Sequence, residues 1–183
     1  MIMNTEKVDP AKMREAAALT QQAVDRFFRG DYEDALNLVE DSLGLNPWYA
    51  RTHCAKALCL LQLGQAKDAL ACTEYALELN DGDAVAYTTR AMCRHRLGER
   101  EGAEADFQRA IDLGPDDYRV FYNAACYWAE RGEEDKCREL FTTAMALAPA
   151  SFAAVAAVDP DLARYSRREW FREVLADVRK RGI

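Results

Sequence analysis

The sequence lacks most of the residue patterns on which catalytic and metal sites depend. It contains only two histidines, His53 and His95, and none of its six cysteines forms a C-x-x-C pair. Closely spaced cysteine or histidine ligands are the usual mark of a structural zinc site. A glycine-rich loop of the phosphate-binding type is also missing. These absences predict a non-catalytic protein that holds neither a metal ion nor a cofactor.

The chain also lacks long apolar runs and an excess of positive charge. No stretch approaches the roughly 18–20 apolar residues of a membrane-spanning helix, and the opening residues show no apolar core of a secretion signal. The 24 basic residues are outnumbered by 31 acidic ones, and the net charge is −7 at pH 7. This balance argues against nucleic-acid binding. We expect a cytoplasmic protein, monomeric or weakly homo-oligomeric, that does not insert into membranes.

Glycine is scarce, but four of the nine glycines recur at one constant interval along the chain. A fixed period of this length indicates a repeat array rather than a fold with a single core. Small residues accompany these glycines at seven residues before and at five and twelve residues after each of them. The glycines are Gly30, Gly64, Gly98 and Gly132, and the small residues are Ala23, Ala57, Ala91 and Ala125, then Ala35, Ala69, Ala103 and Cys137, then Ser42, Ala76, Ala110 and Ala144.

Each unit therefore has the pattern of two closely packed helices joined by a tight turn. The glycine supplies the left-handed conformation that ends the first helix. A leucine follows fifteen residues later, and in three units a proline two residues beyond it stops the second helix. The offsets predict first helices over 10–29, 50–63, 84–97 and 118–131, and second helices over 32–45, 66–79, 100–113 and 134–147.

This pattern resembles the tetratricopeptide repeat, a helix–turn–helix unit of about 34 residues. The bulky side chains that the family places eleven residues before the glycine are present as Tyr87 and Phe121, whereas Leu19 and His53 depart from the pattern. Thr73 is a further departure, nine residues after its glycine. The resemblance covers about residues 16–151, as repeats over 16–49, 50–83, 84–117 and 118–151. It implies an all-α fold, a right-handed α-solenoid.

The two ends of the chain lie outside these repeats. We expect a disordered N-terminus over 1–9, with a four-repeat domain over 10–151 and a C-terminal capping segment over 152–183. Helix potential over 152–158 is cut by Asp159 and Pro160, and a new helix is predicted from about 160 to 180. Its apolar stripe suits a cap on the last repeat. Nearby arginines leave open a second interpretation, a detachable helix for a partner or a membrane surface.

Charge is distributed unevenly between the two helices of each repeat. The predicted first helices sum to +8 and the second helices to −9. In the tetratricopeptide architecture the first helices line a concave groove, so the resemblance implies a basic groove inside an acidic protein. Such a groove would attract an acidic segment. Alternatively, the charges of inner and outer helices pair with one another across the layers.

The same architecture predicts which side chains face the groove. They form a mixed surface of apolar patches and hydrogen-bond donors, suited to a peptide or helical partner. These candidate residues are Arg51, Cys54, Leu58, Thr88, Met92, His95, Arg96, Arg119, Tyr122, Asn123 and Cys126. The asparagine pair with which some relatives clamp a chaperone's C-terminal carboxylate is absent.

The sequence thus favours a protein–protein interaction adaptor or scaffold, and we expect the segment that it binds to be acidic. The alternative is a dedicated client chaperone, similar to the small tetratricopeptide chaperones of secretion systems. The cysteines are expected to be small buried hydrophobes in a reducing compartment. Cys54 and Cys126 are predicted on the groove side, where a thiol is accessible to reagents, but no neighbouring residue marks a lowered pKa for either of them.

Overall fold

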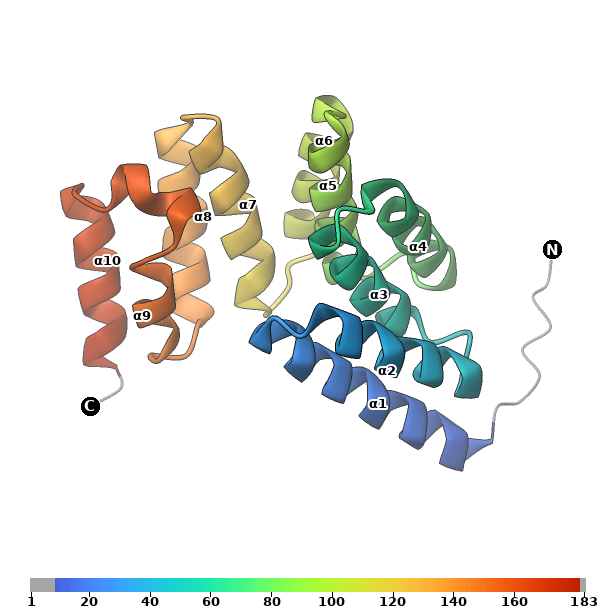
Figure 1. Cartoon of the computed structure of the whole chain (residues 1–183). Coiled ribbons are helices and arrows are strands. Elements are labelled where there is room, and N and C mark those ends of the chain that lie inside the picture. Colours follow the sequence, from blue (N-terminus) through green and yellow to red (C-terminus); the bar gives the residue numbers. More distant parts are fainter. Residues whose placement is uncertain (1–8, 182–183) are drawn as a thin grey trace. The chain divides into compact units, whose positions relative to one another are not determined.

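The computed structural model describes residues 9–181, and every regular element in that range is a helix (Figure 1). Of the N-terminus predicted to be disordered, residues 1–8 lie outside the described residues. Asp9 caps the first helix by accepting from the Ala11 N–H at 2.9 Å. The chain divides into two compact units, which we call the first unit (residues 9–109) and the second unit (residues 110–181). The predicted limits of the four-repeat domain and of the capping segment stay predictions.

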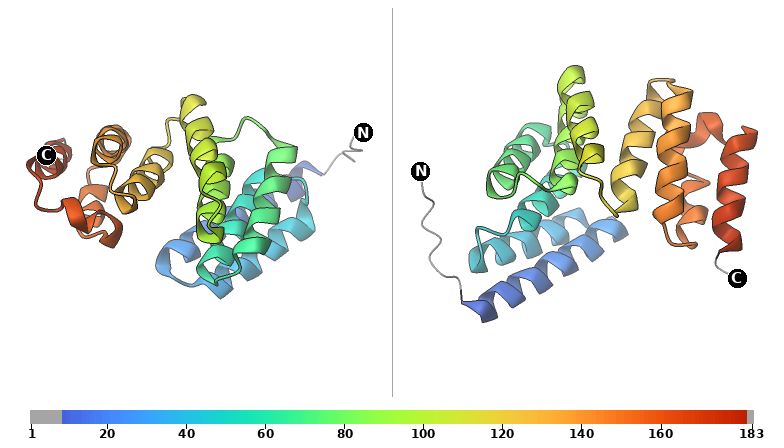
Figure 2. Two further views of the ribbon diagram at one scale, coloured as in Figure 1. Left: turned by 90° about the horizontal axis from the view of Figure 1, so that it is seen from above. Right: turned by 180° about the vertical axis from the view of Figure 1, so that it is seen from behind.

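The first unit is built from antiparallel helix pairs. Neighbouring helices along the chain pack against each other, as the two views in Figure 2 show for α1 and α2. All of these helices match the predicted spans to within one residue. They are α1 (Pro10–Arg29), α2 (Tyr32–Leu45), α3 (Ala50–Gln62), α4 (Ala66–Leu79), α5 (Ala84–Leu97) and α6 (Arg100–Asp112), the last of which runs past the end of the unit.

The turn glycines have the conformation that the repeat requires. Gly30 and Gly98 have φ angles of +87° and +80°, in the left-handed region that other residues rarely adopt. The backbone N–H of Gly98 donates to the His95 carbonyl, and the next N–H, of Glu99, donates to the Arg94 carbonyl. These bonds satisfy the last carbonyls of α5 and reverse the chain into α6.

The small residues lie where the helices approach most closely. Ala23, Ala57 and Ala91 in the first helices are buried, as are Ala35, Ala69 and Ala103 in the second helices. A methyl group is the largest side chain that these contacts accommodate without displacing a helix. The repeated alanines therefore fix the distance between the paired helices and, with it, the rotation of each helix.

We call these small-residue positions at the helix contacts alanine slots. One of them holds a hydroxyl group instead of a methyl group. Ser42 is buried beside Thr20 of α1 and Thr52 of α3, with oxygen–oxygen distances of 2.9 Å and 3.2 Å. Thr20 and Thr52 are themselves 2.7 Å apart, and Ser42 donates to the Ala16 carbonyl. Each buried hydroxyl thus has a partner, and the network joins three helices at one point.

The second unit contains one further helix pair and the C-terminal segment. Its core surrounds Phe141 and Met145 of α8, and Phe171 of α10 stacks on Phe141 at a ring distance of 4.8 Å. Leu175 and Val178 of α10 are also buried. Its helices are α7 (Tyr118–Glu130), α8 (Glu134–Leu147), α9 (Phe152–Ala156), the 3-10 helix η1 (Pro160–Tyr165) and α10 (Glu169–Lys180). The apolar stripe of α10 therefore covers the fourth repeat, as a cap does.

The prediction of one continuous helix over 160–180 is wrong. Asp159 caps η1 by accepting from the Asp161 N–H at 2.8 Å, and the 3-10 helix ends at Tyr165 before α10 begins at Glu169. The break follows from the repeat itself, because Ser166 lies one repeat period after Gly132 and so occupies the turn position. Similarly, α9 begins one repeat period after the start of α7. The segment is a fifth, degenerate helix pair whose first helix is interrupted at Pro160.

The alanine slots make a direct prediction about stability. Replacing Ala57 or Ala91 by leucine overfills a buried contact and should lower the free energy of unfolding by roughly 1–3 kcal/mol. The matched control is Ala71→Leu, which adds the same atoms at an exposed position of α4 and should change stability by less than about 0.5 kcal/mol. Urea unfolding measures all three variants. Equal stabilities would contradict the proposed helix contacts.

Candidate functional site

The first helices of the first unit are α1, α3 and α5, and we call the face that these three helices present its inner face. α3 contacts both α1 and α5. Six residues before the turn glycine, each of these helices carries an aliphatic side chain that is only half-buried: Val24, Leu58 and Met92. Because the three positions are equivalent in successive repeats, they form a line across the helices. We call this line the apolar row.

Exposed polar and aromatic side chains border the apolar row. Two residues before each glycine lie Phe28, Gln62 and Arg96, all of them exposed. Phe28 is 66% exposed and meets the ring of Phe27 edge-on at 5.6 Å. Arg51, in the first turn of α3, is exposed on the other side of the row. The inner face thus combines aliphatic anchors with two accessible guanidinium groups.

Two predicted site residues of the first unit do not lie on this face. Cys54 is buried against Ala76, Leu77 and Ala86 of the neighbouring helices. Thr88 is also buried, and its hydroxyl donates to the Ala84 carbonyl at 2.8 Å. Both stand ten residues before a glycine, a position that faces the helix packing instead of the inner face. Their assignment to a partner surface is therefore wrong.

The other predicted residues of the first unit are accessible to different degrees. Arg51 and Arg96 are exposed, and Leu58, Met92 and His95 are half-buried. They come from α3 and α5, which contact each other. Val24 and Phe28 of α1 stand at the same repeat positions as Leu58 and Arg96, and the repeat pattern predicts them on the same face.

The predicted site residues of α7 belong to the second unit. Two of them, Arg119 and Tyr122, form hydrogen bonds with other residues of the same unit. Arg119 donates from its guanidinium to both oxygens of Asp117, the cap of α7, and this hydrogen bonding raises the arginine's pKa. Tyr122 is buried and its hydroxyl donates to Asp159 at 2.6 Å, so its assignment to a partner surface is also wrong. Asn123 and Cys126 are half-buried.

Cys126 lies near two carboxylates. The ligand atoms of Cys126, Asp159 and Asp161 lie within 4.8 Å of one another. Both oxygens of Asp159 already accept hydrogen bonds, one from Tyr122 and one from the Asp161 N–H. The group therefore fastens the start of η1 to α7, and we assign it this structural role.

Charge pairing removes much of the positive charge expected on the inner helices. Asp106 of α6 is buried and accepts from Arg90 at 2.7 and 2.8 Å and from Arg94 at 2.7 Å. Gly102 makes room for this contact, because a β-carbon there would lie 3.0 Å from the Arg94 side chain. Lys56 similarly pairs with Glu40. The alternative of pairing across the layers is correct for these residues.

Arg51 and Arg96 differ from these paired groups. Within residues 9–181 neither side chain forms an ion pair or a hydrogen bond, and both are exposed. Two exposed guanidinium groups, one on either side of the apolar row, are therefore available to a partner on the inner face.

The cysteine thiols are held in their unreactive, protonated form. Burial raises the pKa of Cys54, and the nearby Asp83 carboxylate raises it further. Burial likewise raises the pKa of Cys126, with Asp159 acting in the same direction. Burial also raises the pKa of Cys59 to about 11 and that of Cys93 to about 12. The raised pKa values of Cys54 and Cys126 therefore disfavour the reactive thiolate, and Cys54 is also buried.

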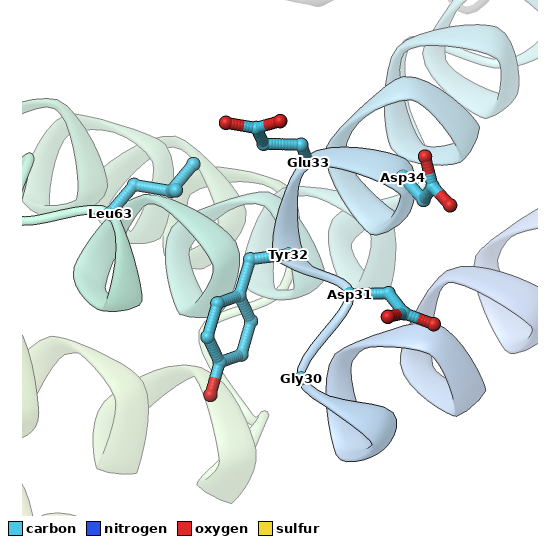
Figure 3. A pocket seen from close by; sticks show the side chains of 6 residues that line it. All are labelled: Gly30, Asp31, Tyr32, Glu33, Asp34 and Leu63. Carbon is cyan, nitrogen blue, oxygen red and sulfur yellow. The ribbon is translucent and has the colours of Figure 1, made fainter.

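A shallow depression lies at the turn between α1 and α2 (Figure 3). It is lined by Gly30, Asp31, Tyr32, Glu33, Asp34 and Leu63. The side chains do not converge, since Tyr32 and Glu33 point to opposite sides. Two of the carboxylates pair with Arg26, at 3.4 Å for Asp31 and 3.7 Å for Asp34. Acidic side chains are favourable at this place because the N-terminus of α2 is the positive end of the helix dipole.

Comparison with known families decides the classification. A sequence model described as tetratricopeptide repeat matches residues 29–93, and a second model with the same description matches residues 84–117. The chain belongs to the tetratricopeptide repeat family. The resemblance inferred from the glycine spacing is thus confirmed. No curated protein matches the sequence as a relative, and among the described residues no helix is long and apolar enough to span a membrane.

Solved structures share this tetratricopeptide fold. A thermophilic tetratricopeptide protein of Thermus thermophilus has a TM-score of 0.68 at 21% identity, over 91% of this chain and 96% of that one. The Arabidopsis OM64 domain has a TM-score of 0.56 at 20% identity, over 70% and 98% of the two chains. The first such domain of Spaghetti (RPAP3), bound to the HSP90 peptide SRMEEVD, has a TM-score of 0.55 at 20% identity, over 70% and 91%.

The raised thiol pKa values predict slow alkylation. In the native protein at about pH 7.5, all six cysteines should react with iodoacetamide more slowly than a free cysteine, whose pKa is about 8.5. In urea all six should react fully. An Ala71→Cys variant provides an exposed thiol as the control. Mass spectrometry of the labelled peptides reads each site, and labelling of Cys54 or Cys126 at the rate of the control would contradict the assignment.

Proposed function

We propose that this tetratricopeptide repeat protein is a non-catalytic adaptor that binds a peptide or helical segment on the inner face of its first unit. The observation that supports the proposal most strongly is the apolar row between Arg51 and Arg96. Half-buried aliphatic side chains offer a partner apolar area, which supplies affinity. The two exposed guanidinium groups favour a partner with carboxylates and speed its approach.

The ion pairs formed by the other basic residues of α5 narrow the proposal to particular arginines. Arg90 and Arg94 of α5 are bound to Asp106, so they stabilise the helix pair and are not available to a partner. Arg96, on the same helix, is exposed to solvent. The related domain that binds SRMEEVD provides a precedent, since that peptide carries three carboxylate side chains. An acidic segment is therefore the partner that we propose here.

Charge reversal on the inner face tests the proposal. The double variant Arg51→Glu, Arg96→Glu should slow association with a partner purified alongside the tagged protein by about tenfold or more, with a smaller change in dissociation. The wild-type association rate should fall as salt is added, because charges are screened over about 8 Å at physiological ionic strength. Surface plasmon resonance measures both rates.

The matched control reverses two exposed basic residues of second helices. Lys67→Glu, Arg138→Glu changes the net charge by the same amount on α4 and α8, and it should leave association nearly unchanged. Loss of binding in the control with none in the inner-face variant would place the partner on the outer helices and reject the proposal. The stoichiometry of the purified complex also separates an adaptor from a chaperone, since a dedicated chaperone has one stoichiometric client.

A further inference from the structure

The apolar row also restricts the conformation of the partner. Neighbouring packed helices are separated by about 8–10 Å, so consecutive anchors on α1, α3 and α5 recur at that interval. A partner that uses all three must present apolar side chains on one face with the same spacing. The common backbone conformations differ in the spacings that they offer.

An α-helix and a β-strand differ clearly in this respect. A helix rises about 1.5 Å per residue, so side chains seven residues apart share a face and lie about 10.5 Å apart. A strand rises about 3.3 Å per residue with alternating faces, so same-face side chains lie about 6.6 or 13 Å apart. The helix comes close to the interval of the row, whereas the strand misses it in either register.

A polyproline II segment is the remaining competitor. Its repeat of three residues spans about 9.3 Å, which fits the row, but it has no internal hydrogen bonds. Its backbone carbonyls would need donors from the inner face. Thr89 is buried and donates to the Val85 carbonyl at 2.8 Å, and Gln21 donates to Asp25 at 3.1 Å. The exposed donors beside the row are Gln62, Arg51 and Arg96. Grooves that bind such segments are usually lined by aromatic rings, whereas this row is aliphatic.

The arginines add a second restriction. Arg51 lies seven residues before Leu58, and Arg96 lies four residues after Met92. The first helices run in the same direction, so the two arginines flank the apolar row on opposite sides, at about 10 Å and 6 Å along the helix axes. A helix of about 10 Å diameter laid on the row has both of its flanks within reach of a guanidinium group. Carboxylates are therefore expected on both sides of its apolar stripe.

From these observations we infer that the partner binds as an amphipathic α-helix laid across α1, α3 and α5. It carries apolar side chains at every seventh position, one for each residue of the apolar row, and acidic side chains on both flanks. This inference rests on the proposed function, and it specifies the partner as a helix with heptad spacing and a negative charge. A helix satisfies its own backbone, so the inner face has to supply only apolar area and two positive charges.

Selection from a random library of displayed peptides, each long enough for several helical turns, tests this inference. The full-length wild type is the target, and peptides that still bind Leu58→Glu are removed. Ala71→Glu, on the outer side of α4, is the matched control and should retain the selected peptides. Arg96→Glu is a second inner-face variant, at an exposed site where folding is not at risk. Circular dichroism checks that each variant is folded.

The expected peptides have apolar residues seven apart, acidic residues on both flanks and no proline. Synthetic versions should gain helicity on binding, and a central proline should weaken binding by about tenfold or more, as loss of an interface anchor does. Selected peptides with prolines and a three-residue spacing would overturn the helical inference while the site on the inner face stood. A library in which every peptide that binds wild type also binds Leu58→Glu, or selected peptides that bind Arg96→Glu as tightly as wild type, would overturn the site itself, and with it the proposed function.

Discussion

The close approach of paired helices at alanine-sized slots is the constraint on which the rest of this structure depends. Ala57 of α3 and Ala69 of α4 are both buried where these helices meet. Contacts without bulky side chains hold each helix at one distance and one rotation. The same slots recur in every repeat, so successive pairs have the same geometry. A surface feature on one helix therefore has an equivalent on the next.

This regularity turns separate side chains into a surface. Val24, Leu58 and Met92 are distant in sequence, yet their common slot aligns them across three helices. The fixed rotation also separates two kinds of arginine on α5. Arg94 is bound to Asp106 of α6, whereas Arg96 is exposed to solvent. Of these two residues on one helix, Arg94 stabilises the helix pair and Arg96 is the one that we propose for recognition.

The sequence predicts the helix bounds well, because the constant glycine spacing fixes both the turns and the positions at which paired helices contact each other. The break before α10 was also readable, since Ser166 falls at the turn position of a fifth unit, but the loss of glycine there concealed it. Spacing assigns a residue to a face without showing what covers that face. For this reason spacing alone assigns Cys54 and Tyr122 to a partner surface, although neighbouring elements bury both side chains. The pairing of Arg90 with Asp106 joins residues 16 positions apart, and charge counts alone do not reveal it.

Photo-crosslinking from the apolar row tests the central claim most directly. The full-length protein with p-benzoylphenylalanine in place of Leu58 is mixed with the partner that co-purifies with it, and is compared with a protein carrying the same group in place of Ala71 on the outer side of α4. The account predicts a covalent adduct from position 58 and none from position 71. An adduct from position 71 alone would show that the partner lies on the outer helices, and would contradict the account.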